Sequence, residues 1–147
     1  MPTASIKKNI SCSKENLIKI VLDIEKYPEF VPWCLKGKIH SINDRGNKNE
    51  IIADLTIGKS FLNETYKSLV IYDKSLDYIL VTNIEGPLKY LENKWYFKSI
   101  KNTTEVDFSI NFELKSKILN LLITKSFDIG IRKITDAFEK RARKLFS

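Results

Sequence analysis

The sequence DIEKYPEFVPWC, residues 23–34, places two prolines and three large aromatic side chains within a short segment. A loop is normally polar, because its backbone has to meet water. Here the prolines stiffen a segment that carries Tyr27, Phe30 and Trp33, so some apolar surface has to cover these rings. That surface is either the body of the protein itself or a bound ligand, and the residues alone leave both possibilities open.

The sequence before this stretch predicts a short strand and then a short helix. Residues 5–10 are typical of a first strand, and Ser13 is suited to cap the helix that follows. Pro28 ends the helical pattern, because proline has no backbone N–H to donate. The apolar side chains of this helix recur at the spacing of one helical face: Leu17, Ile20, Val21 and Ile24.

Residues 35–114 predict about six further strands, separated by turn signals at residues 43–47, 58, 86–87 and 102–103. The last strand has the clearest alternation, with polar side chains between its apolar ones. One dry face and one wet face are typical of an antiparallel sheet. The apolar positions of this strand are Val106, Phe108, Ile110, Phe112 and Leu114.

From Ser116 the sequence predicts one continuous helix of about 30 residues, or ~45 Å, running nearly to the end of the chain. Gly130 interrupts it, at a cost of about 1 kcal/mol relative to alanine. A local bend, or the close approach of a ligand or of the sheet, would compensate; a tolerated surface glycine is the alternative. The apolar stripe of the helix is Ile123, Phe127, Ile131, Ile134, Phe138, Ala142 and Leu145.

These elements predict an α+β domain spanning residues 1–147 with a helix-grip fold. A curved antiparallel sheet of about seven strands would wrap around the long C-terminal helix, with one or two short helices after the first strand. The apolar faces of sheet and helix either pack directly or enclose a cavity, and periodicity does not separate these outcomes.

The composition favours an anionic partner and argues against several kinds of catalytic site. A net charge of +7 suits contact with phospholipid or RNA, although general over-use of lysine would also produce it. Residues 116–147 carry eight basic and three acidic side chains. A single histidine, His40, makes a serine–histidine pair or a histidine-based metal site improbable, and two cysteines form no metal-binding spacing. No catalytic residue or metal ligand is therefore assigned.

Residues 23–34 closely resemble the signature of the coenzyme Q-binding START-domain proteins, within the polyketide cyclase/dehydrase-like, START-related superfamily. Further stretches resemble the same family in the same order: Tyr66-Lys67-Ser68, Gly86-Pro87-Leu88, Trp95-Tyr96-Phe97, residues 112–116 and residues 137–142. The resemblance implies a tunnel between the sheet and the C-terminal helix. Eukaryotic members bind ubiquinone and support respiratory electron transfer, whereas a bacterial branch is named for association with the large ribosomal subunit.

We therefore expect a lipid chaperone rather than an enzyme. Ubiquinone or a related prenyl quinone would be its ligand, no other cofactor is expected, and the absence of a transit peptide favours the bacterial cytoplasm, with peripheral contact at the inner membrane. The alternative is a toxin-like regulator that binds the large ribosomal subunit and inhibits translation. The oligomeric state stays open.

Two groups of residues are the candidates for binding. The hydroxyl of Tyr66 would bond a quinone carbonyl if its strand face, shared with Glu64, points inward. The expected ligand contacts are Phe30, Trp33, Tyr66, Trp95, Phe97, Phe108, Phe112, Ile123, Phe127, Gly130, Ile131 and Ile134. The expected membrane or RNA contacts are Leu121, Leu122, Lys140, Arg141, Arg143 and Lys144.

Overall fold

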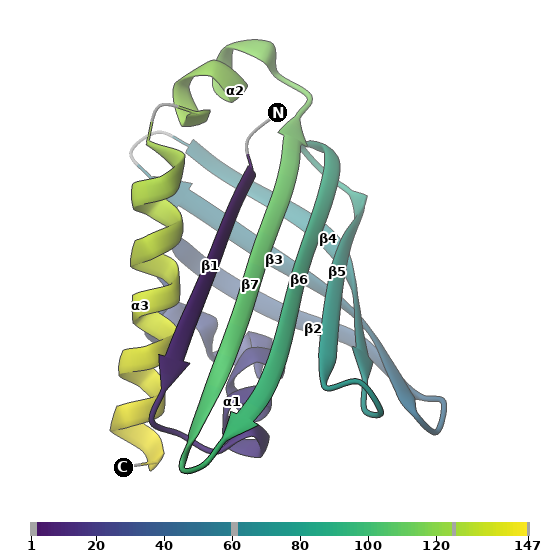
Figure 1. Cartoon of the computed structure of the whole chain (residues 1–147). Coiled ribbons are helices and arrows are strands. Elements are labelled where there is room, and N and C mark those ends of the chain that lie inside the picture. Colours follow the sequence, from purple (N-terminus) through teal and green to yellow (C-terminus); the bar gives the residue numbers. More distant parts are fainter. Residues whose placement is uncertain (1–2, 60–61, 125, 147) are drawn as a thin grey trace.

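The computed structural model describes residues 3–59, 62–124 and 126–146, which form one curved sheet and the helices around it (Figure 1). The strands are β1 (Thr3–Ile10), β2 (Cys34–Asp44), β3 (Lys48–Lys59), β4 (Leu62–Asp73), β5 (Tyr78–Glu85), β6 (Leu88–Ile100) and β7 (Thr103–Leu114). The helices are α1 (Lys14–Leu22), the 3-10 helix η1 (Ile24–Glu29), α2 (Lys117–Thr124) and α3 (Phe127–Phe146).

The seven strands are antiparallel and ordered β1-β7-β6-β5-β4-β3-β2, so β1 and β2 are the two edges. The sheet curls until β2, β3 and β4 lie behind β1 and β7, and α3 runs alongside β1 (Figure 1). This arrangement confirms the predicted helix-grip fold. The predicted dry face of β7 is also confirmed, since Val106, Phe108 and Phe112 are buried.

Helix α1 begins where the sequence predicted and ends earlier. The Ser13 hydroxyl oxygen accepts a hydrogen bond from the backbone N–H of Asn16 at 3.2 Å, which confirms the cap. The helix ends at Leu22, where the N–H of Asp23 turns back to the carbonyls of Lys19 and Ile20. Pro28 therefore does not end α1; it lies inside η1.

The 3-10 helix η1 lies directly on the edge strand β2. A Cβ at Gly37 would stand 2.3 Å from the carbonyl oxygen of Ile24, so only glycine permits this approach. The carboxylate of Glu25 accepts the backbone N–H of Ile39 at 2.9 Å, which satisfies a donor on the open edge. The aromatic stretch that follows η1 thus begins from a fixed position.

The predicted continuous C-terminal helix is wrong, because the chain forms two helices, α2 and α3. Helix α2 crosses the end of the sheet at a steep angle to α3 (Figure 1). The side chain of Asn120 accepts the backbone N–H of Leu114 at 2.9 Å and so ties α2 to the end of β7. The break precedes Phe127, and Gly130 lies within α3 without bending it out of helical geometry.

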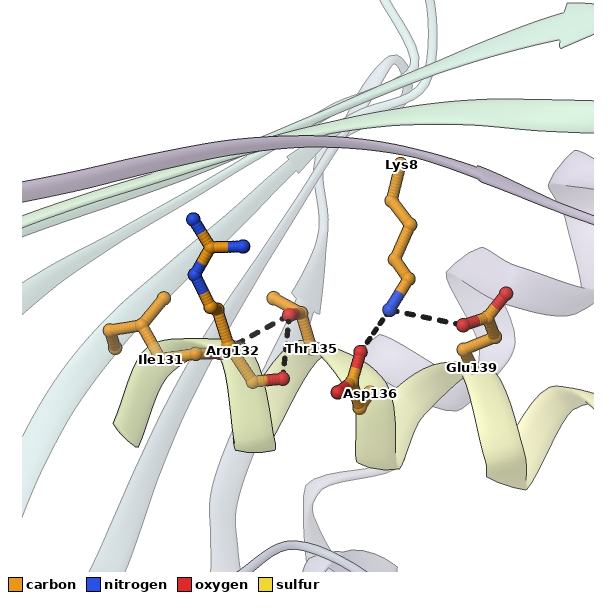
Figure 2. Close-up of polar contacts among 6 residues, drawn as sticks. All are labelled: Lys8, Ile131, Arg132, Thr135, Asp136 and Glu139. Carbon is orange, nitrogen blue, oxygen red and sulfur yellow. Dashed lines mark hydrogen bonds and ion pairs between the residues drawn. The ribbon is translucent and has the colours of Figure 1, made fainter. Parts of the chain in front are cut away.

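Helix α3 is joined to the edge strand β1 by an inward-pointing lysine. Figure 2 shows Lys8 reaching from β1 to the carboxylates of Asp136 and Glu139, the latter at 3.0 Å. The hydroxyl of Thr135, the residue before Asp136, donates to the carbonyls of Ile131 and Arg132 at 3.2 and 3.1 Å. An inward charge on an edge strand opposes pairing with another chain, and here it also positions the helix.

The ion pair predicts an acid-sensitive contribution to stability. The hydrogen bond from Lys8 lowers the pKa of Asp136 in the folded protein. The stability that this ion pair contributes is therefore fully present above about pH 4, the pKa of an aspartate in the unfolded chain, and is lost as the pH falls through the lowered pKa. Because Asp136 is largely exposed, Asp136→Asn should lower the free energy of unfolding at neutral pH by less than about 1 kcal/mol. Urea unfolding across pH measures this difference, which should shrink as the pH falls through the lowered pKa of Asp136.

The matched control is Asp107→Asn, on the opposite face of the sheet. If the free energy of unfolding of the Asp136 variant stays below that of wild type by the same amount in acid, the negative charge of this carboxylate is not what stabilises the protein.

Candidate ligand-binding site

The concave face of the sheet forms an apolar wall that is only partly covered. Strand register places Val70, Val81, Asn93 and Ile110 side by side across β4, β5, β6 and β7. Val70 is buried, whereas Val81 and Ile110 remain partly exposed, as do other apolar side chains packed against the core: Leu55, Tyr66 and Ile134. Solvent, or a ligand in its place, therefore reaches part of this wall.

The end of the interior near α1 is closed by aromatic packing. The ring of Trp95 lies 4.7 Å from that of Phe108 and 5.1 Å from that of Phe138, centroid to centroid, and stacks parallel to Phe97. The cavity among these rings has a volume of about 20 Å³, which is room for about one water molecule. Trp95, Phe97 and Phe108, expected to contact a ligand, are buried in the core and line this small cavity.

Polar side chains on the wall are mostly satisfied by the protein itself. The indole N–H of Trp95 donates to Asn93 at 2.9 Å, and the Asn93 amide donates to the carbonyl of Ser109 at 2.9 Å. Asn83 donates to the carbonyl of Leu88 and accepts the N–H of Leu91. These amides fix the sheet, so they are poor candidates for binding a ligand head group.

Tyr66 differs from these amides. It faces the core, and burial raises the pKa of its hydroxyl, so this group stays protonated and able to donate. Within the described residues the hydroxyl makes no hydrogen bond. Glu64, two residues earlier, lies on the same face of β4 near the end of the strand and is exposed, so of these two side chains only that of Tyr66 packs against the core.

Trp33 and Gly130, both expected to contact a ligand, lie in contact with each other. The backbone of Trp33 has a φ of 64°, and its carbonyl accepts the N–H of Gly58 at 2.9 Å. A Cβ at Gly130 would lie 3.6 Å from the indole ring. The group near this glycine is thus a ring of the loop after η1, neither a ligand nor the sheet, and it leaves room for a Cβ at ordinary contact distance.

Phe30 packs against α3 rather than into the interior. Its ring makes edge-to-face contacts with Phe138 and Tyr27, at 5.1 and 5.9 Å between centroids. The guanidinium of Arg141 lies 5.0 Å above the ring and is paired with Glu29 at 2.9 Å. Arg141, whose side chain is 12% exposed, therefore fastens the aromatic loop to the helix.

The other expected contacts are divided between the interior and the surface. Phe112 and Phe127 are buried with ring centroids 5.0 Å apart, Ile131 is buried, and Ile134 is partly buried. Leu121 is 70% exposed on α2. The side chains of Leu122 and Ile123 lie outside the described part of the chain. None of the helices that the structure describes is long and apolar enough to span a membrane.

A surface groove of about 460 Å³ lies between the aromatic loop and α3. Sequence analysis predicted its basic members as a cluster but missed Lys133 and the groove itself. Lys133, Lys140 and Lys144 are separated by seven and four residues, a helical spacing that could have placed them on one face. The lining residues are Glu29, Phe30, Pro32, Lys133, Asp136, Ala137, Lys140, Arg141 and Lys144; the expected Arg143 is not among them.

Comparisons with known proteins show the family of this chain and two of its relatives. The family profile described as polyketide cyclase / dehydrase and lipid transport matches residues 11–139. The chain is 39% identical to the ribosome association toxin RatA of Rickettsia prowazekii, over 89% of each chain. It is 28% identical to the mitochondrial coenzyme Q-binding protein COQ10 of Dictyostelium discoideum, over 98% of this chain and 70% of that protein.

A solved START superfamily protein from Mycobacterium smegmatis has the same fold. It superposes with a TM-score of 0.81 at 18% identity, over 97% of this chain and 98% of that one. This likeness shows the fold, and the family profile that matches residues 11–139 confirms the predicted resemblance to the polyketide cyclase/dehydrase-like family.

The contact between Gly130 and Trp33 predicts opposite effects for a small and a large side chain. Gly130→Ala should be tolerated and should stabilise the protein by up to about 1 kcal/mol, because its Cβ meets the ring at ordinary contact distance. Gly130→Leu should displace Trp33 and lower the melting temperature. Thermal unfolding and tryptophan fluorescence measure both effects. An equally stable leucine variant with unchanged fluorescence would contradict the contact.

Proposed function

We propose a function for this chain, which belongs to the polyketide cyclase / dehydrase and lipid transport family: it binds an apolar, lipid-like molecule between the concave face of the sheet and α3. The observation that carries the proposal is the partly exposed apolar wall around Val81 and Ile110, with the Tyr66 hydroxyl as a free donor within the described residues. The proposed activity is binding, without covalent chemistry.

A prenyl quinone fits the chemistry of this wall. Burying an apolar tail contributes about 25 cal/mol per Å², so affinity can come from the wall itself. A single protonated hydroxyl, that of Tyr66, can then select a head group that carries a carbonyl oxygen. Similarity to a coenzyme Q-binding protein supports the quinone as the ligand to test first.

The proposal predicts that protein purified without detergent carries a quinone or a similar lipid. Tyr66→Phe should weaken binding about tenfold, because one hydrogen bond to the head group is lost. Val81→Phe should abolish retention by filling the space at the wall. Mass spectrometry of organic extracts, and titration of the extracted protein with ubiquinone, provide the measurements.

The matched control is Thr82→Phe, which adds the same ring on the opposite face of β5 and should leave retention unchanged. Melting temperatures separate lost binding from lost folding. Wild-type protein that carries no lipid and takes up no added quinone would rule out this function.

Association with the large ribosomal subunit is the second candidate function. The observation that favours it is the row of exposed lysines along α3, and a relative 39% identical bears the name of a ribosome association toxin. Binding through phosphates releases counterions and therefore weakens steeply as salt rises.

This second function predicts that purified large subunits sediment together with the protein at low salt and release it as salt increases. Small subunits and salt-washed membranes serve as comparisons. Failure to sediment with large subunits even at low salt would exclude ribosome association and leave the lipid proposal untouched.

A further inference from the structure

The groove between the aromatic loop and α3 carries positive charge that its own acidic residues do not neutralise. Glu29 is paired with Arg141 at 2.9 Å and with Lys26 at 3.4 Å, and Asp136 is paired with Lys8. Among the described residues, no ion pair involves the three remaining cations of the groove: Lys133, Lys140 and Lys144. The acidic side chains thus hold the groove together, while the lysines stay available for a ligand.

The three lysines form a line rather than a cluster. Along the helix axis Lys140 lies about 10 Å beyond Lys133, and Lys144 about 6 Å beyond Lys140, at 1.5 Å per residue. One phosphate group cannot contact charges spread over such a length. A linear polyanion lying in the groove can contact each lysine in turn.

The wall opposite the lysines offers flat, partly apolar surfaces. Phe30 and Pro32 are partly exposed there, and the guanidinium of Arg141, which reaches across from α3, lies over the Phe30 ring. Aromatic rings and arginine planes are the surfaces on which unpaired bases stack. The site is also recessed, so a flexible strand can enter it more readily than a flat bilayer surface can.

We propose that this groove binds a single-stranded RNA segment, with phosphates along Lys133, Lys140 and Lys144 and a base against the wall of Phe30, Pro32 and Arg141. The inference rests on the second proposed function and names its binding surface and ligand. It uses the outward face of α3 and leaves the inward face to the apolar ligand.

The test is binding of a fluorescently labelled oligouridylate, followed by anisotropy across a range of salt concentrations. Lys133→Gln/Lys140→Gln should bind about tenfold more weakly than wild type. Its salt dependence, as the slope of log K against log salt, should fall by about 1.4, since each phosphate contact to a single strand contributes about 0.7. The control Lys36→Gln/Lys98→Gln replaces two exposed lysines outside the groove, so its net charge equals that of the groove variant. It should bind like wild type.

Any of three results would overturn the inference, two from binding measurements and one from sedimentation. One is equal RNA binding by the groove variant and the control. The other is a groove variant that loses binding to phosphatidylglycerol vesicles while keeping its affinity for RNA, which would assign the groove to a membrane surface. If large subunits sediment with the groove variant as with wild type, the groove inference fails while ribosome association stands. Failure of the wild type to sediment defeats the second function instead.

Discussion

The ring of Phe138 is the contact on which the arrangement of this protein depends. It lies 5.4 Å from the ring of Tyr27, 5.1 Å from that of Phe30 and 5.1 Å from that of Trp95. Phe138 belongs to α3, Trp95 to the sheet, and the other two rings to η1 and the loop after it. One buried side chain thus joins three layers, and aromatic pairs of this kind add stability beyond their buried area.

Fixing α3 in this way gives its two faces different environments. The inward face directs Ile131 and Ile134 to the core, where the sheet wall is partly open. The outward face places Lys133 and Lys140 along the groove. A lipid-like ligand and a polyanion would therefore use different residues of one helix, so the two proposed functions need not exclude each other.

Alternation and helical spacing predicted those parts of the fold that local sequence determines. The Ser13 cap and the buried face of β7 are examples, because each depends on residues a few positions apart. The break before α3 could not be predicted from spacing, since the apolar stripe continues from Ile123 to Phe127 without a change of period. The groove was missed because it needs Glu29 and Arg141, which are 112 positions apart, to meet.

The same reasoning answers why a loop should carry so many aromatic rings. Each ring packs against the protein while staying partly exposed: Tyr27 and Phe30 pack against Phe138 of α3, and Trp33 packs against the helix at Gly130. The loop after η1 therefore serves to hold α3 at a set position over the curved sheet. That position determines how far the apolar wall of the sheet stays open, and it also determines how the lysines of α3 face the loop. The aromatic residues of the loop therefore shape both candidate sites, even where they do not touch a ligand.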